Sequence, residues 1–596
     1  MKLQLDRPHV LALAGRFPAL GDGLQEQLRF GHRIELRSHT LPIEALEFLA
    51  RLYEDAGAAL AGRAAQLRGL VAALRSASPR FGPGDALEAV LPALVRYLAR
   101  DSARGWLFAA NVAGKPLAWV PTRIDFVVGS SEELGKVMLE LKANARGVLI
   151  SQSVRFTEAD LQGRSVAELL AAKGFLKETP ELLAAYDASA ARYFDWRGRY
   201  GGQFAGQGTA FLAEDPSATH RDTDWSRKDQ VILSAGGGAA RLVNDEGILP
   251  PRGTGLESPG DILAPYLRRA AKSSDYDCEE EVKALAASLP DHLFTRLPVQ
   301  AYLFLFHLGL HQHLWVHVDD IAPYVYQPEI RHKLVLPPEQ TELIDILTAE
   351  MDVLQDDVVA GKGGGTTVLC AGPPGVGKTL TAEVYAEVTG RPLYRVHSGQ
   401  LGLSVGAMEV ALKEALTRAQ RWGAVMLIDE ADVYIRKRSD DIAANAVVGV
   451  FLRVLEYFDG LLFLTTNRIG DIDEAIVSRC IALIRYTAPD QAARERIWRV
   501  MAAQFGLVLD DALIATLAAS YPQASGRDIK GLAKLVAKFC SHKALPPTLG
   551  VFARCAMFRA LEDVGPKTPA ASPPEGSSAC LGRPGEGSAA TPIGAD

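Results

Sequence analysis

The sequence lacks any long segment that is purely apolar. Its longest apolar run, 299–316, contains three histidines, and the run 447–464 contains one arginine and two acidic residues, so neither is a candidate membrane span. The first twenty residues carry charges at positions 6, 7 and 16, which interrupts the apolar core that a signal peptide needs. We therefore expect a cytoplasmic protein with no membrane partner.

The chain also has few cysteines and no net positive charge. The six cysteines lie far apart and form no C-x-x-C pair, so the sequence has neither a zinc signature nor a disulfide framework and fits a reducing cytosol. The formal net charge of −7 gives no overall electrostatic reason to expect nucleic acid as a partner. With 48% hydrophobic and 23% charged residues, the composition is that of an ordinary globular protein, and 596 residues are enough for several domains.

The first half of the chain changes character along its length. Residues from about 42 to 100 are rich in alanine, leucine and arginine with helical spacing, which predicts a helical region at 1–103. Short β-prone runs in 104–250 predict a β-rich (α+β) domain. We expect a helical and extended connector at 251–333. At the other end, 564–596 hold almost no large apolar residue, which predicts a disordered tail.

Two features of the first half suggest sites that we do not favour. His307 and His311 are four residues apart, the spacing of a metal pair on a helix, but their surroundings are apolar and aromatic, which favours a structural role. The glycines at 236–238 follow an apolar run, yet no lysine or hydroxyl residue completes a phosphate loop there. We interpret 236–238 as a turn.

A glycine-rich loop in the second half carries a much stronger signal. The pattern G-x-x-x-x-G-K-T at 372–379 follows a β-branched run and opens a helix-like run. In that context, backbone N–H groups and the positive end of the helix cradle phosphates, while Lys378 reaches the β- and γ-phosphates and Thr379 binds magnesium. The predicted nucleotide-binding residues here are Gly372, Pro374, Gly375, Val376, Gly377, Lys378, Thr379 and Leu380.

About fifty residues later an apolar strand ends in acidic residues, at Asp429 and Glu430. In a parallel sheet this places the carboxylates beside the phosphates. Asp429 is suited to hold Mg²⁺ and Glu430 to polarise the attacking water. The simpler interpretation, a buried strand followed by a helix N-cap, remains as the alternative.

Two further polar residues follow this strand in the sequence. Asn467 comes directly after the apolar run 461–466, and its amide could hold the same water because it both donates and accepts hydrogen bonds. Arg479 ends a short helix-like segment, from which an arginine could stabilise charge in a neighbouring subunit's site.

In order and spacing, these motifs resemble those of the AAA group of AAA+ ATPases over about 334–563. The passages 391–394 and 451–457 also resemble a group of large AAA proteins with long N-terminal regions. The resemblance implies a multidomain chain in which an α/β P-loop core with a parallel five-stranded sheet occupies 334–487 and a C-terminal helical lid occupies 488–563.

Roles for individual residues follow from the same resemblance. It implies a Walker A loop at 372–379, and it assigns further roles to single residues: Walker B Asp429, catalytic Glu430, sensor-1 Asn467, arginine finger Arg479 and sensor-2 Arg527. Family members use ATP and Mg²⁺, assemble as hexameric rings and remodel protein partners. We therefore expect a homo-oligomeric, Mg-dependent ATPase acting on a protein client.

Two departures from the family pattern bear on how the energy is used. The segment 398–406 has no aromatic residue where protein-threading members carry a pore loop, and Ser478 stands where a second finger arginine would fall. These departures leave open a nucleotide-dependent assembly switch or scaffold that does not thread protein. A DNA-remodelling ATPase is the third alternative, and the acidic balance of the chain counts against it.

Overall fold

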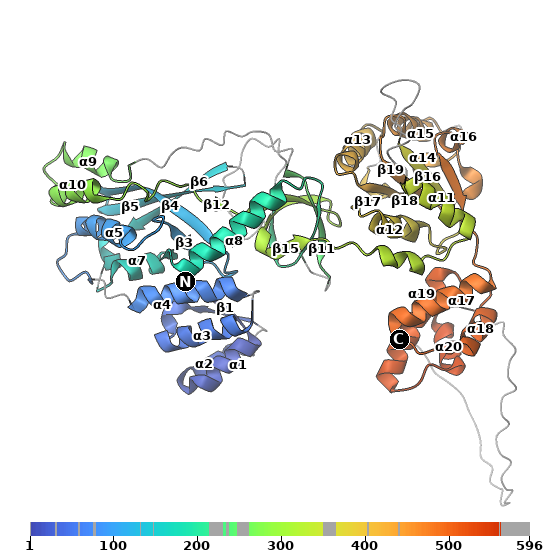
Figure 1. The fold of residues 1–596 in the computed structure, drawn as a ribbon, viewed down its shortest axis with the longest axis horizontal. Helices are drawn as coiled ribbons and strands as arrows, with labels where there is room; N and C mark the ends of the chain where they lie inside the picture. Colours follow the sequence, from blue (N-terminus) through green and yellow to red (C-terminus); the bar gives the residue numbers. More distant parts are fainter. Residues whose placement is uncertain are drawn as a thin grey trace, which may run out of the picture. The chain divides into compact units, whose positions relative to one another are not determined.

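The computed structural model describes residues 2–561 apart from 30–32, 58–59, 76–78, 132, 147, 162, 214–229, 234–237, 247–260, 350–364, 402–404, 439–440 and 560. The chain divides into two compact units. Figure 1 labels its helices and strands. The first comprises 1–331, 341–371 and 379–484, and the second comprises 332–340, 372–378 and 485–596.

The first unit begins with a two-stranded antiparallel sheet and a group of helices. The strands are β1 (Lys2–Asp6) and β2 (Arg33–Arg37), and the helices are α1 (Arg7–Arg16), α2 (Pro18–Leu28), α3 (Ile43–Asp55), α4 (Ala61–Arg75) and α5 (Val90–Ala99). Helix α3 is amphipathic, because apolar residues three and four apart share the face that is buried. These helices do not form a separate core, since their buried residues continue into the sheet that follows.

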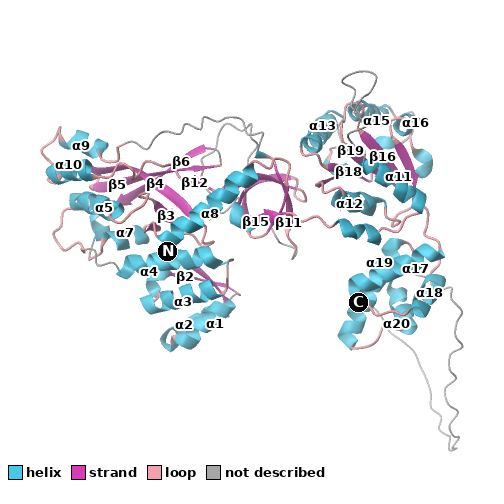
Figure 2. Ribbon diagram, viewed as in Figure 1, coloured by secondary structure: helices cyan, strands magenta, loops and turns pink. Residues whose placement is uncertain are grey.

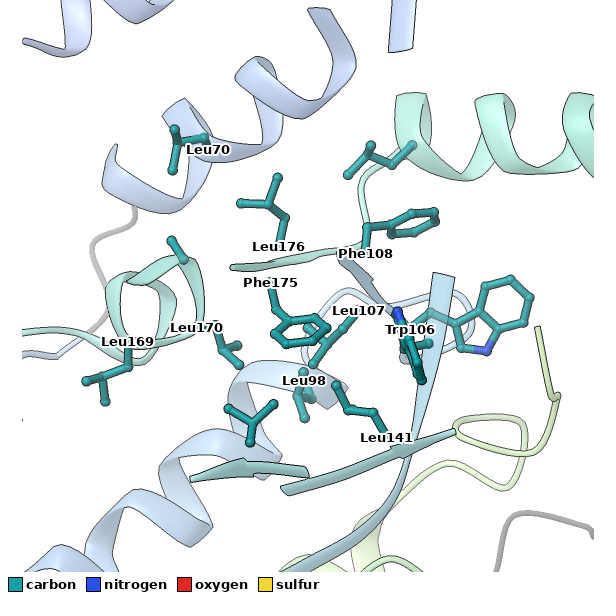
Figure 3. Close-up of a cluster of buried hydrophobic side chains, with 14 of the residues drawn as sticks. Leu70, Leu98, Trp106, Leu107, Phe108, Leu141, Leu169, Leu170, Phe175 and Leu176 are labelled. Carbon is teal, nitrogen blue, oxygen red and sulfur yellow. The ribbon is translucent and has the colours of Figure 1, made fainter. Parts of the chain in front are cut away.

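That following sheet has the strand order β12-β5-β4-β3-β7, with β6 paired to β5. Its strands and the associated helices are β3 (Leu107–Ala109), β4 (Leu117–Val127), β5 (Lys136–Ala145), β6 (Val148–Phe156), α6 (Glu158–Leu161), α7 (Val166–Ala172), β7 (Phe175–Lys177), α9 (Ala264–Ala270), α10 (Glu279–Ser288) and β12 (Val299–Gln300). Strand β5 alternates strictly between buried and half-buried residues, as expected for a sheet covered on one face. In Figure 3, Leu98 of α5, Leu107 of β3 and Phe175 of β7 lie together in this core.

A seven-stranded antiparallel sheet follows, in the order β10-β9-β14-β13-β11-β8-β15. Its elements are α8 (Pro180–Arg197), β8 (Gln203–Gly206), β9 (Thr209–Leu212), β10 (Gln230–Ile232), β11 (Ala240–Asn244), β13 (Tyr302–His307), β14 (Gln312–His317) and β15 (Ile321–Pro323). Residues 299–323, predicted as part of a connector, therefore supply strands to both larger sheets of the first half.

The second half contains a five-stranded sheet in the order β17-β18-β19-β16-β20, whose pairings β16–β19, β17–β18 and β18–β19 are parallel. Its elements are α11 (Pro338–Ala349), β16 (Thr366–Ala371), α12 (Lys378–Val388), β17 (Leu393–His397), α13 (Val405–Arg421), β18 (Val425–Asp429), α14 (Asp432–Ile435), α15 (Ile442–Leu455), β19 (Leu461–Thr466), α16 (Glu474–Val477) and β20 (Ala482–Arg485). Strands β16, β18 and β19 are buried at every residue, because helices cover both faces of the sheet.

The last described segment is helical and belongs to the second unit (Figure 2). Its helices are α17 (Gln491–Phe505), α18 (Asp511–Ser520), α19 (Gly526–Lys543) and α20 (Leu549–Ala556). They share one apolar core that includes Trp498, Ile529 and Phe552. Ser525 and Asp528 form a reciprocal capping box at the start of α19.

Within the first unit, the seven-stranded sheet packs against the five-stranded sheet and its helices. Val243, Phe306 and Leu308 share a buried cluster with residues such as Tyr394 and Trp422. The Phe306 and Trp422 rings lie 5.1 Å apart between centroids. The chain's first half is thus attached to the sheet that carries the phosphate loop.

The predicted fold class is confirmed, since the chain is multidomain, with helices and β-sheets in its first half and a parallel five-stranded sheet in its second. The domain boundaries stay predictions. The predicted tail at 564–596 and most of the glycine run at 236–238 lie outside the described residues. None of the described helices is both long and apolar enough to cross a membrane.

Candidate active site

The phosphate loop connects β16 to α12 and is shaped by close backbone contacts. Gly375 has a φ of +82°, and a Cβ at this position would lie 2.6 Å from Ser525 Oγ. At Gly372 a Cβ would lie 2.5 Å from the carbonyl oxygen of Tyr486. Glycine is therefore required at both positions for steric reasons, independently of any ligand.

Lys378 is the first residue of α12 and folds back over the loop. Its Nζ donates to the carbonyl oxygens of Gly372 and Pro373 over 2.7 and 2.6 Å, and the residue is only 7% exposed. The other loop residues predicted to bind nucleotide are less buried, with half-buried Val376 and Gly377 and exposed Pro374 and Leu380. The ammonium group is thus held at the loop, where phosphate binding would require it.

Arg527, the predicted sensor-2 residue, touches the phosphate loop through its backbone. Its N–H donates to the carbonyl oxygen of Gly375 over 3.2 Å. The same glycine faces the Ser525 cap of α19, so the start of this helix packs directly on the loop. A displacement of the Gly375 backbone would therefore alter the contacts of the first turn of α19.

Thr379 and Asp429 lie together, as predicted for a shared magnesium site. Thr379 Oγ1 donates to Asp429 Oδ1 over 2.9 Å, and Thr465 Oγ1 donates to the same oxygen over 2.6 Å. Strand pairing explains the arrangement, because β18 lies beside β19 and the carboxyl ends of parallel strands meet at one edge of the sheet.

Glu430 follows Asp429 in an unusual backbone conformation. Its φ of +56° lies in the left-handed region, which costs a non-glycine residue about 1–3 kcal/mol. The backbone N–H of Glu430 donates to Thr465 Oγ1 over 3.0 Å, which helps to hold this conformation, and the side chain is exposed. Strain of this kind is frequent at functional positions.

Asn467 is exposed directly after β19. Its backbone N–H donates to Asp432 Oδ1 over 3.2 Å, and the hydroxyl of Thr466 donates to the same oxygen. Asp432 therefore fixes the segment that presents Asn467. Arg479 is also exposed, but its side chain contacts the carbonyl oxygen of Ala475 and the Glu456 carboxylate rather than other predicted site residues.

Comparison with known proteins identifies this region. The family model described as "ATPase family associated with various cellular activities (AAA)" matches residues 368–487. Residues 368–487 form an AAA domain. The matched stretch contains every predicted site residue except Arg527, which lies in the helical segment that follows.

Similarity to individual proteins covers only part of the chain. The AAA family ATPase y4kL of Sinorhizobium fredii is 30% identical over 151 residues, which are 24% of this chain and 46% of the relative. The ATP-dependent zinc metalloprotease FtsH 3 of Sphaerobacter thermophilus is 32% identical, covering 27% of this chain and 35% of the relative. The 26S proteasome regulatory subunit 8 of Caenorhabditis elegans is 28% identical, covering 34% and 49%. The chain thus spans less than half the length of each of these relatives.

Two residues of the AAA domain that sequence reasoning missed surround Asp429. Thr465 bonds both the Asp429 carboxylate and the Glu430 backbone. Arg395, on the neighbouring strand β17, donates from Nη2 to Asp429 Oδ2 over 2.5 Å. Thr465 is one of two consecutive threonines at the end of β19, and nothing in the sequence distinguishes it. Arg395, by contrast, is a charged residue in the middle of β17, which is a signal that the sequence does contain.

The carboxylate of Asp429 is kept ionised by these partners. Burial acts to raise its pKa, but hydrogen bonds from Thr465 and Thr379, together with the charge of Arg395, outweigh burial and lower the pKa below its ordinary value. An ionised carboxylate beside a hydroxyl is the donor set that Mg²⁺ uses when water and substrate phosphates complete its shell. Thr379 and Asp429 therefore fit the ion, whose role here would be to neutralise phosphate charge.

The histidines of the seven-stranded sheet have partners unrelated to metal. His307 Nδ1 accepts from the backbone N–H groups of Gly309 and Leu310, and His313 Nε2 lies 2.8 Å from Asp245 Oδ2. Among the described residues, no group of three or more His, Cys, Asp or Glu side chains could hold a metal ion.

Proposed function

We propose that the AAA domain binds ATP with Mg²⁺ and hydrolyses it to ADP and phosphate. The observation that carries the proposal is the 2.9 Å hydrogen bond between Thr379 and Asp429, which joins the last residue of the loop at 372–379 to the last residue of β18. A hydroxyl and a carboxylate in these two positions are the magnesium ligands of P-loop nucleotide hydrolases.

The remaining predicted residues have complementary tasks in this proposal. Lys378 and the loop N–H groups bind the phosphates, and Arg527 links the γ-phosphate to the helical lid. Glu430 accepts a proton from the attacking water, and Asn467 orients that water. Arg479 acts on the nucleotide of the adjacent subunit in a homo-oligomer, expected to be a hexameric ring, which agrees with its exposure in the single chain.

Glu430→Gln tests the hydrolytic assignment. The amide cannot accept the proton, so we expect steady-state ATP turnover to fall about 100-fold or more, while binding of a fluorescent ATP analogue stays near the wild-type level. Glu414→Gln, an exposed substitution on α13, is the matched control and keeps its turnover. Undiminished turnover in Glu430→Gln would remove Glu430 from the mechanism.

We further propose that residues 1–333 recruit a protein partner, which the ATPase remodels in the cytoplasm. Support comes from the contact between the seven-stranded sheet and the AAA domain, because this contact would transmit nucleotide-dependent changes to the recruiting region. Glu430→Gln in ATP should retain a partner that wild type releases, and mass spectrometry of the captured material identifies it. If a purified partner keeps its fold and its own assembly in the presence of wild type and ATP, remodelling is wrong.

An assembly switch is the second candidate, and the lack of an aromatic residue in 398–406 favours it. Residues 402–404 lie outside the described part of the chain. A switch predicts that ATP changes the oligomeric state, measured by light scattering, without unfolding a bound protein. ATP-dependent unfolding of a captured partner would favour remodelling instead.

A further inference from the structure

Arg395 is a charged residue in β17, the edge strand of the five-stranded sheet. Strand β17 pairs in parallel with β18, and His397 lies opposite Asp429 in this register. Arg395 Nη2 donates to Asp429 Oδ2 over 2.5 Å, and its Nη1 lies 3.8 Å from Glu383 Oε1 on α12. Arg395 therefore links the edge strand to the carboxylate proposed to bind Mg²⁺.

Both carboxylate oxygens of Asp429 accept hydrogen bonds from other side chains. Oδ1 accepts hydrogen bonds from two threonines, Thr379 and Thr465, and Oδ2 accepts from Arg395. The carboxylate is nearly buried, with a side-chain exposure of 9%, whereas Arg395 is 39% exposed. A guanidinium and a divalent cation have the same sign of charge, so they compete for this carboxylate, and the competition is only partly screened by water.

We propose that Arg395 is a positioning residue that keeps Asp429 Oδ1 directed at Thr379 and disfavours binding of a free divalent cation before nucleotide arrives. The phosphates of ATP bring several negative charges, which offset the repulsion between Arg395 and the cation. Mg²⁺ then enters together with ATP rather than ahead of it. This inference rests on the proposed function, because it takes Asp429 as a ligand of the ion.

Manganese binding to the nucleotide-free protein tests the proposal without measuring hydrolysis. Mn²⁺ prefers the same oxygen ligands as Mg²⁺, and the free ion is counted by electron paramagnetic resonance. We expect Arg395→Ala and Arg395→Gln to bind Mn²⁺ about tenfold more tightly than wild type, because each removes the competing charge. Arg395→Lys keeps the charge and should stay within about threefold of wild type.

Two controls localise the effect. Arg499→Ala removes an exposed arginine that pairs with Asp511 over 2.9 Å, and it should leave Mn²⁺ affinity unchanged. Adding Asp429→Asn to Arg395→Ala should abolish the gain in affinity. Thermal unfolding identifies variants that are folded, and Arg395→Gln, which keeps a hydrogen-bond donor, replaces the alanine variant if that one does not fold.

The proposal is overturned if the folded neutral variants bind Mn²⁺ no more tightly than wild type, or if Arg395→Lys gains as much affinity as they do. A gain that survives Asp429→Asn also overturns it, because the ion would then bind elsewhere. Failure of the ATPase assignment is seen separately, as the absence of ATP turnover in the wild type, and it does not affect the measurement of Mn²⁺ binding to the nucleotide-free protein.

Discussion

The two ends of helix α12 differ in how they are held. The first residues, Lys378 and Thr379, belong to a local motif and contact the phosphate loop and Asp429. Near the other end, Glu387 is only 5% exposed, although it is a carboxylate. It accepts hydrogen bonds from the Tyr324 hydroxyl over 2.7 Å and from the Gln327 N–H over 3.1 Å.

Glu387 also pairs with Arg241 of the seven-stranded sheet, at 3.0 Å. Its three partners come from the chain's first half and its connector, whereas the partners of the N-terminal end lie within the AAA domain. One helix therefore joins the phosphate-binding end of the ATPase to the region proposed to recruit a partner. The proposed catalytic residues and the attachment to the first half therefore lie at opposite ends of one helix, through which they can be coupled.

The largest effect is expected at the phosphate-binding end, for Gly375→Ala. Alanine at a φ of +82° is strained, and its Cβ would overlap Ser525 Oγ, so we expect a loss of about 2–5 kcal/mol in unfolding free energy. Binding of a fluorescent ATP analogue should weaken as well. Thermal unfolding and nucleotide titration measure the two effects.

Gly423→Ala is the control for backbone strain alone. Gly423 has a φ of +60°, and a Cβ there would meet nothing within 4 Å. We expect about 1–2 kcal/mol of destabilisation and unchanged ATP binding. If both variants behaved alike, the contact between the loop and the cap of α19 would have no energetic importance.

At the opposite end of α12, Glu387→Ala should lower the unfolding free energy by about 1–3 kcal/mol, because the Tyr324 hydroxyl and the Gln327 N–H lose their acceptor. The Arg241 side chain is half-exposed, so water solvates its guanidinium in the variant, which limits the loss of unfolding free energy. A double-mutant cycle with Arg241→Ala isolates the ion pair by chemical denaturation. If the attachment is coupled to catalysis, turnover of ATP also changes, although no residue of the phosphate loop has been altered.

The same contrast explains what the sequence could predict. The loop at 372–379 and the carboxylate of Asp429 were predictable because their residues follow one another, or end adjacent strands, in a recognisable order. The contacts of Glu387 and of Arg395 depend on which strands and domains lie side by side, and no local pattern encodes that. The sharing of strands at 299–323 between two sheets was hidden for the same reason, since pairing partners lie far away in the chain.

A smaller effect is expected at a second contact between the two regions, through Trp422. Its indole N–H donates to Asp245 Oδ1 over 2.9 Å. Trp422→Phe removes this hydrogen bond and opens a cavity. Trp498→Phe opens a cavity of the same kind in the helical lid, where the indole nitrogen has no hydrogen-bond partner among the residues that the structure describes. The first substitution should cost about 1–2 kcal/mol more than the second in unfolding free energy, and equal costs would show that the hydrogen bond contributes nothing.

The smallest effect concerns the charge of Asp245, which is nearly buried and faces Tyr200, His313, Trp422 and Arg421. Burial acts to raise its pKa, but hydrogen bonds from His313 and Trp422 outweigh burial and lower it. A lowered folded-state pKa means that the charge stabilises the fold above the unfolded-state pKa of about 3.9, and that this stabilisation is lost as the pH falls through the folded-state value.

Asp245→Asn removes this titration while keeping an oxygen acceptor for the indole N–H. Wild type should therefore be more stable than the variant at pH 7, and the difference in urea midpoint should shrink at and below about pH 4. A difference that is constant with pH would mean that Asp245 acts through shape and hydrogen bonding rather than through charge. Asp245 would then contribute no acid sensitivity to the attachment of the first half to the AAA domain, unlike the other end of α12, where the pKa of Asp429 is lowered in the same direction and its charge is proposed to hold the ion.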